Sequence, residues 1–171
     1  MLQLSSSLTN VPVMSLRTGS PVATAVEPII NPNNLKIEGF YCEDVFDKTR
    51  LVLLCQDIRD TVTGGFVVDD HDTLVEPEDL VRLKDILEIN FELLGKPIET
   101  GSKDKVGKVS DYAAETTTMY IQKIYAGQSL FKSLTRGSLS IDRSQIVEVT
   151  SKRIVINELL KTAPAGAAVA A

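Results

Sequence analysis

Short runs of alternating apolar and polar residues fill most of the chain, and one of these runs occurs twice. Residues 35–42 read LKIEGFYC, and residues 119–126 read MYIQKIYA. Their apolar positions are Leu35, Ile37, Phe40 and Cys42 in the first run and Met119, Ile121, Ile124 and Ala126 in the second. The spacing is two, three and two in both runs, whereas a strand buried on one face repeats at two. The extra residue predicts a β-bulge at Gly39 and at Lys123, which would bend both strands at the same place.

The similarity between the two runs continues on both sides of them. The further matching segments are 8–15 with 93–100, and 57–70 with 145–158. In this alignment Pro12 falls opposite Pro97, and Val67 falls opposite Val155. The offset drifts from 85 to 84 to 88 residues, as expected when only the loops differ in length. A period this long indicates two related units rather than a solenoid of short repeats.

Each unit is expected to consist of short strands separated by turns. The strands expected before the repeated runs are 11–14 and 22–30 in the first unit, and 97–100 and 106–115 in the second. The sequence TGGF places Gly64 and Gly65 in a two-residue hairpin turn, and SKRI at 151–154 predicts a turn in the second unit that is longer or of another type. Short strands that bend are typical of small barrels. We therefore predict a mainly β fold of two small β-barrels in tandem, joined by a short α-helix.

The joining helix is predicted over residues 77–89. Pro77 falls in the first turn and Glu78 at the positive end of the helix dipole, and Leu80 and Leu83 follow a helical spacing. This helix is expected to plug one barrel and to lead into the next. The expected organisation is 1–76 for the first barrel, 77–90 for the linker helix, 91–158 for the second barrel and 159–171 for a disordered tail.

Composition and charge are those of a soluble globular protein. Hydrophobic residues make up 43% of the chain and charged residues 24%. No run approaches the roughly 18 apolar residues of a membrane helix, and no secretory signal is recognised, so we expect a cytoplasmic protein without membrane insertion. Residues 1–90 contain 7 Lys and Arg against 15 Asp and Glu, and residues 91–171 contain 11 against 8. This split favours an acidic and a basic unit with different neighbours over a uniformly basic nucleic-acid-binding protein.

One acidic cluster surrounds the only histidine of the chain. Its members are Asp69, Asp70, His71 and Asp72. Hard divalent ions use such oxygen ligands, but acidic residues after a hairpin strand are common in solvated turns. These four residues are therefore weak candidates for metal binding, and the sequence predicts no metal or cofactor.

Other reactive residues do not form a recognisable catalytic motif. The segment 101–109, GSKDKVGKV, lacks the spacing and the helix of a Walker loop, and Gly107 predicts a tight turn or close backbone packing. Cys42 and Cys55 lie in strand-like runs without a CxxC spacing and are expected to be buried. With one histidine and no nucleophile in a strained turn, the sequence predicts that the protein is not an enzyme.

The stretch 128–143, QSLFKSLTRGSLSIDR, alternates apolar residues with cations. As a loop across a barrel mouth it would offer a surface to a protein partner. The candidate partner-binding residues are Leu130, Phe131, Lys132, Arg136 and Arg143. In the alternative interpretation, Leu130, Phe131 and Leu134 only cap the core of the second barrel.

The second unit resembles the PRC-barrel domain. Residues 94–97, LGKP, match the apolar-Gly-Lys-Pro-Val strand that opens this family, and residues 107–109, GKV, match its later Gly-Lys-Val strand. The unit ends in RSQIVEVTSKRIVI at 143–156, whereas the first unit departs from the pattern with Asn10 in place of the first glycine. The resemblance covers about residues 8–158. It implies a tandem bacterial PRC-barrel protein that docks onto a larger assembly without catalysis, and it assigns no functional residue.

The function predicted from these features is that of a non-enzymatic cytoplasmic adaptor or assembly factor with a protein partner. Two alternatives stay open. The first is ribosome maturation or RNA-associated binding through the basic second unit. The second is a small-ligand or metal sensor that uses a barrel mouth and the acidic cluster.

Overall fold

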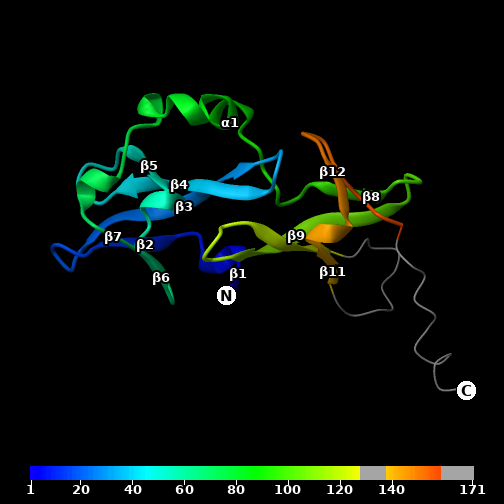
Figure 1. Ribbon diagram of the computed structural model, residues 1–171, viewed down its shortest axis with the longest axis horizontal. Coiled ribbons are helices and arrows are strands. Elements are labelled where there is room, and N and C mark those ends of the chain that lie inside the picture. The colour runs from blue at the N-terminus through cyan, green and yellow to red at the C-terminus, as the bar shows by residue number, and fades with distance from the viewer. Residues whose placement is uncertain (128–137, 159–171) are drawn as a thin grey trace, which may run out of the picture.

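The fold is mainly β, with two mixed sheets and one short α-helix. The computed structural model describes residues 1–127 and 138–158. The two sheets lie side by side along the long axis of the molecule, with the first unit at the left of Figure 1 and the second at the right.

The first sheet contains six strands in the order β5-β4-β3-β2-β7-β6. They are β2 (Val11–Ser15), β3 (Pro21–Asn31), β4 (Lys36–Asp44), β5 (Arg50–Leu54), β6 (Asp60–Val62) and β7 (Gly65–Val68). The strands β2 and β7 are parallel, and all other neighbours are antiparallel.

The second sheet repeats this topology with the order β11-β10-β9-β8-β13-β12. The strands in this order are β8 (Pro97–Thr100), β9 (Lys105–Glu115), β10 (Ile121–Gly127), β11 (Leu139–Asp142), β12 (Ile146–Val149) and β13 (Ile154–Ile156), and a seventh strand, β1 (Leu2–Leu4), pairs with β9. The parallel pair is now β8 and β13, in which Glu99 pairs with Val155, as Met14 pairs with Val67 in the first sheet. The predicted duplication is thus confirmed, because both the strand order and the register follow the alignment of the two copies.

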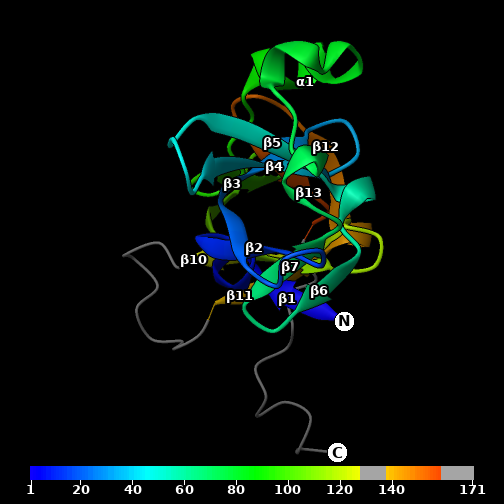
Figure 2. The ribbon, with the colours of Figure 1, turned by 90° about the vertical axis from the view of Figure 1, so that its left-hand side faces the viewer.

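The hydrogen-bonded ladders of the described residues form open sheets and do not close on themselves. The edge strands are β5 and β6 in the first sheet and β11 and β12 in the second. The outer edge of β5 is covered by one short bridge, in which the backbones of Val52 and Val75 exchange hydrogen bonds of 2.8 and 3.0 Å. Seen along the long axis, the strands curl around the core (Figure 2).

The bend predicted for the repeated runs is confirmed at the same place in both units. Two consecutive residues of β3 pair with Ile37 and Gly39, which leaves Glu38 as the extra residue. The same step in register separates Ile121 from Lys123 on β10. All eight apolar positions of the two runs are buried, so the irregular spacing of the sequence keeps one face of each bent strand in the core.

The prediction of a single helix over 77–89 is wrong. Two 3₁₀ turns, Pro77–Asp79 and Val81–Leu83, precede a short α-helix, α1 (Lys84–Ile89). Leu80 lies between the turns with a ψ of 70°, outside the helical region, and so interrupts the helix. None of the residues of α1 is buried, and the helix packs on the outside of β3. It therefore covers the first sheet and does not plug a barrel.

The closing hairpins differ in length between the units, as predicted. In the first hairpin the turn is Thr63–Gly64, one residue earlier than expected from the glycine pair, with Gly64 at a φ of +85°. In the second hairpin Val149 pairs with Ile154, so the turn spans 150–153 and is longer. The basic sequence SKRI thus replaces a tight glycine turn by a wider one.

Gly107 permits the close backbone packing that the sequence predicts. It lies in β9 with a φ of +151°, a conformation that other residues rarely adopt. A Cβ at this position would run into the carbonyl oxygen of Gly127 on the neighbouring strand β10.

One hydrophobic core extends through both units. Valine, isoleucine and leucine dominate it, and Phe40 and Phe66 contact each other with their ring centroids 4.7 Å apart. Cys42 is buried within this core, and Cys55 is partly buried against it. Burial of both thiols was expected and is confirmed, fully for Cys42 and in part for Cys55.

The two units meet around an approximate twofold axis within the chain, here called the internal axis. The backbone N–H of Ile37 donates to the carbonyl of Met119 at 2.8 Å, and the N–H of Ile121 donates to the carbonyl of Leu35 at 2.9 Å. Since the offset is 84 residues in both cases, equivalent residues exchange roles, as in an isologous dimer interface.

The segment that precedes each unit packs on the long strand of the other unit. The strand β1 (Leu2–Leu4) adds to β9 of the second unit, and α1 covers β3 of the first. Figure 1 shows β1 beside β9 and α1 above β3 and β4. These exchanged segments tie the two units together.

Candidate functional site

Three loops converge at the end of the first unit that lies away from the internal axis. We call this end the distal tip and define it as residues 16–20, 45–49 and 69–73. The backbone N–H of Arg17 donates to the carbonyl of Asp69 at 3.2 Å and so links the first loop to the third, and the N–H of Val45 donates to the carbonyl of Val22 at the start of β3 at 3.2 Å. Two large apolar side chains of the distal tip are exposed, Phe46 at 76% and Leu16 at 62%.

A buried carboxylate fixes the loop that carries Phe46. The side chain of Asp44 is only 4% exposed. It accepts hydrogen bonds from the backbone N–H of Phe46 at 2.7 Å and of Asp47 at 3.4 Å, and it is paired with Nε2 of His71. The rings of Phe46 and His71 also meet edge to face, with centroids 5.7 Å apart. These contacts of Asp44 and His71 therefore hold the backbone of Phe46 in place, although its ring is exposed.

The acidic cluster at 69–72 does not converge on one point. Asp69 forms a two-pronged pair with Arg59, at 2.8 and 3.0 Å. Asp70 accepts from Ser15 at 3.0 Å and from Arg17 at 3.1 Å, and His71 turns to Asp44. In residues 1–127 and 138–158, no three His, Cys, Asp or Glu side chains are grouped to hold a metal ion. Asp69, Asp70 and His71 instead hold the loops of the distal tip in place, while Asp72 stays exposed.

The predicted partner surface of the second unit falls largely on residues that are not described. Leu130, Phe131, Lys132 and Arg136 lie outside the described residues. Arg143 is described, and its guanidinium points inward. It donates to the carbonyl of Ile121 at 3.1 Å and to that of Asn34, and it lies 4.9 Å above the ring of Tyr120. Arg143 thus connects the second unit to the first.

Replacing Arg143 by alanine is expected to lower the free energy of unfolding by about 1–3 kcal/mol, because two charge-assisted hydrogen bonds are lost, of which the one to Asn34 joins the second unit to the first. Urea unfolding followed by circular dichroism measures this change. Arg143→Lys is the matched control and should recover only part of the loss, since an ammonium lacks the planar fork. If the alanine variant is as stable as the wild type, Arg143 does not stabilise the fold, and a role in binding a partner would again be the better interpretation.

Two equivalent clefts flank the internal axis. Cleft A lies between segment 55–61 of the first unit and turn 116–119 of the second, and cleft B lies between segment 143–149 and turn 32–35. Each cleft has a volume of about 380 Å³. The positions correspond at offsets of 88 and 84 residues, so that the duplication has produced the same cleft twice.

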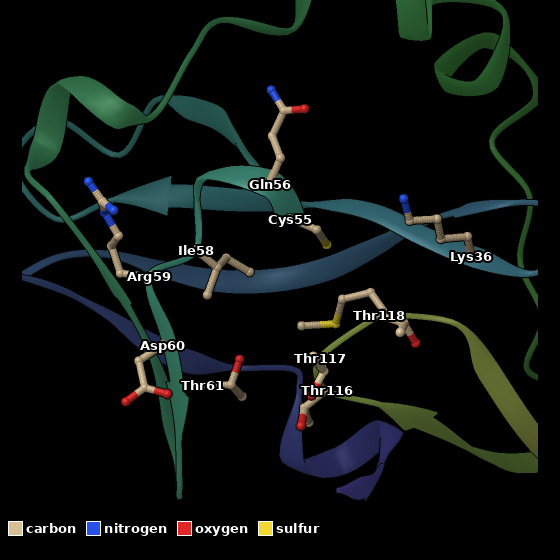
Figure 3. Close-up of a pocket in the computed structure, with 11 residues that line it drawn as sticks. Lys36, Cys55, Gln56, Ile58, Arg59, Asp60, Thr61, Thr116, Thr117 and Thr118 are labelled. Carbon is tan, nitrogen blue, oxygen red and sulfur yellow. The ribbon is translucent and has the colours of Figure 1, made fainter.

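Cleft A combines a partly apolar floor with a rim of hydroxyl groups. Figure 3 shows Cys55 and Ile58 pointing toward the threonines of turn 116–118, with Lys36 at one end of the cleft. Burial raises the pKa of the Cys55 thiol to about 12. Because the thiolate is the reactive form, this cysteine is a poor nucleophile near neutral pH.

The sequence analysis did not predict Phe46 as a candidate binding residue, and it predicted neither cleft. The signal for Phe46 was present, because DVFDK places an aromatic residue between turn-forming acids, where the chain must reverse between two strands. The clefts could not be found in this way, since each is assembled from segments that lie far apart in the chain.

Comparisons with known proteins do not assign a family. No model of a known protein family matches the chain, and no curated protein matches it. Within the described part of the chain, no helix is long and apolar enough to cross a membrane. The resemblance to the PRC-barrel domain stays a prediction.

Proposed function

We propose that the protein is a non-catalytic cytoplasmic adaptor that docks a protein partner through the distal tip. The observation that carries this proposal is Phe46, an aromatic side chain that is 76% exposed on a loop fixed by Asp44 and His71. Aromatic residues are enriched among the side chains that contribute most to binding. A side chain whose backbone is already ordered loses less entropy when it binds.

The duplicated fold supports the same proposal. We infer that both units are PRC-barrel-like modules whose curled sheets close through side-chain packing of the core. The supporting observations are the LGKP and GKV segments of the second unit and the shared strand order of the two sheets. Docking onto a larger assembly is the function that the resemblance implies.

Binding of RNA by the second unit is the alternative, and two of its four described cations already have partners. Lys123 is one of the cations that would contact phosphate, and its ammonium lies 3.5 Å from the carboxylate of Asp142. Arg143, another, is held by backbone carbonyls. Neither of these two cations is free to neutralise a phosphate without giving up an existing contact. Lys105 and Lys108 on β9, which would also contact phosphate, are exposed and form no ion pair within the described residues.

A crosslinking pull-down from cells of the native organism tests the docking proposal. Phe46→Ala should lose the captured protein, while Val147→Ala should retain it. Val147 is a matched control because it is also exposed, at 62%, but lies on the edge strand β12 of the other unit. Capture that Phe46→Ala leaves unchanged would contradict docking through the distal tip. No captured protein together with turnover on a substrate panel would contradict the adaptor function itself.

A further inference from the structure

The outer edge of β5 accepts an extended segment of the same chain. The backbones of Val52 and Val75 exchange hydrogen bonds of 2.8 and 3.0 Å in an antiparallel bridge. Leu74, the residue before Val75, has an extended backbone and is buried in the hydrophobic core. The first unit thus shows what this edge of the fold binds, namely two consecutive apolar residues in an extended conformation.

The strand β11 is the counterpart of β5, residue by residue. Val52 on β5 pairs with Tyr41 on β4, and Ser140 on β11 pairs with Tyr125 on β10. Both pairs lie in antiparallel ladders, in which the N–H and C=O of one residue point to the same side of the strand. Ser140 therefore turns these two groups toward the outer edge, as Val52 does. Figure 1 shows the two edges on opposite sides of the molecule, β5 at the upper left and β11 at the lower right.

The outer edge of β11 lacks the cover that β5 has. Within residues 1–127 and 138–158, no backbone hydrogen bond or bridge joins Ser140 to a segment other than β10. The exposure of the side chains differs accordingly. Val52 is buried and Leu51 is partly buried, whereas their counterparts Ser140 and Leu139 are exposed. An edge with unpaired N–H and C=O groups is a ready site for a further strand.

The chain's own continuation is a poor match for this edge. Seven residues lead from the end of β7 to Val75, and the same count from the end of β13 reaches Ala163. The pair Leu74–Val75 is thereby replaced by Thr162 and Ala163, and the next residue is Pro164, which has no N–H. A large apolar side chain such as that of Leu74 is missing from this pair. The sequence therefore favours an occupant from another protein.

We propose that the outer edge of β11 is a docking site for an extended segment of a partner protein, which adds to the second sheet as an antiparallel strand. The segment carries two consecutive apolar residues. The first lies opposite Ile141, and the backbone of the second exchanges two hydrogen bonds with Ser140, as Leu74 and Val75 do on β5. This inference goes beyond docking through the distal tip and does not depend on it.

Titration of the ¹⁵N-labelled full chain with a peptide, followed by NMR, tests the proposal. The probe is the acetylated and amidated peptide DTLVEPE, which is the chain's own sequence 72–78 around the cover of β5. The amide signals of Leu139, Ser140 and Ile141 should shift and saturate. The same peptide with an N-methylated valine keeps its side chains but loses the bridging N–H, so it should bind at least about tenfold more weakly. Equal binding of the two peptides, no binding of either, or shifts that map to β5, β6 or β12 instead would overturn the proposal.

Two variants locate the binding on β11. Ser140→Pro removes the outward N–H of the edge and should abolish binding of the peptide. Ser140→Ala keeps the backbone groups and should bind like the wild type. Wild-type affinity in a folded Ser140→Pro would refute the site, and if this variant does not fold, the comparison of the two peptides decides.

Two further measurements distinguish the other possible occupants. If the chain's own end covered β11, the double variant Leu159→Asp/Leu160→Asp of the full chain would bind the peptide more tightly, whereas unchanged affinity supports an external partner. A concentration-dependent dimer in sedimentation equilibrium that Ser140→Pro abolishes would assign the edge to a second copy and overturn the partner assignment. Phe46→Ala should bind the peptide like the wild type, because Phe46 lies at the distal tip of the other unit. Failure of the peptide to bind therefore leaves the docking function of the distal tip untouched.

Discussion

Replacing Phe40 by alanine is expected to lower the free energy of unfolding by about 3–5 kcal/mol. Phe40 is fully buried, and its ring lies 4.7 Å from that of Phe66. The alanine variant would lose the transfer energy of the ring and leave a cavity that the stiff β-branched neighbours cannot fill. Urea unfolding monitored by circular dichroism measures the change.

Phe46→Ala is the matched control, because it makes the same chemical change in the same unit. Phe46 is largely exposed, so the free energy of unfolding should stay within about 0.5 kcal/mol of the wild type. Equal losses in the two variants would mean that Phe46 is buried in solution, which would contradict both the core and the distal tip described here.

Replacing Asp44 by alanine is expected to lower the free energy of unfolding by about 2–4 kcal/mol near neutral pH, since three donors lose a buried, charged acceptor. Two of these donors are backbone N–H groups, of Phe46 and Asp47, and the third is His71. Asp72→Ala is the control, because Asp72 belongs to the same tip but is exposed. A stability of Asp44→Ala equal to that of the control would show that the loop is not held by this carboxylate.

The contribution of Asp44 should also depend on pH. Burial raises the pKa of Asp44, but the hydrogen bonds from His71 and from the backbone of Phe46 and Asp47 outweigh this, so its pKa lies below the ordinary value. A carboxyl group with a lowered folded-state pKa stabilises the fold above its unfolded-state pKa, and this stabilisation is lost as the pH falls through the folded-state pKa.

Measuring urea midpoints from about pH 7 to about pH 2 tests this dependence. The wild type should lose more stability on acidification than Asp44→Asn, which has no charge to lose at this position. Part of the loss should persist in the variant, because the pKa values of Asp69 and Asp70 are also lowered by their hydrogen bonds. Identical acid profiles would contradict the role of Asp44.

Much of the fold could be predicted because its signals are local. The strand spacing of two, three and two placed the bends near Gly39 and Lys123, where the ladders do change register. The alignment of the copies matched residues that occupy equivalent ladder positions, in the pair β2–β7 of one sheet and the pair β8–β13 of the other. The prediction of one helix over 77–89 was wrong, because leucine spacing indicates amphipathic character but does not detect a backbone break at Leu80.

The candidate sites were predicted less well. The acidic residues 69–72 were read as a weak metal cluster, although their partners, Arg59, Asp44 and Ser15, come from other strands and loops. Arg143 was read as a partner contact because a cation between apolar residues is normally exposed. Its acceptors, the carbonyls of Ile121 and Asn34, are backbone groups that no side-chain pattern can reveal.

The sequence by itself determined the duplication, the class of fold and the bent strand at the centre of each unit, since alternation and its interruptions act between neighbouring residues. Only the tertiary structure decided how the copies meet, that Phe46 is exposed at the distal tip, and that one cleft holds Arg143 while its twin holds Cys55. These features depend on which residues meet across the fold, and such contacts join segments that can lie more than 100 residues apart, as Arg143 and Asn34 do with a separation of 109.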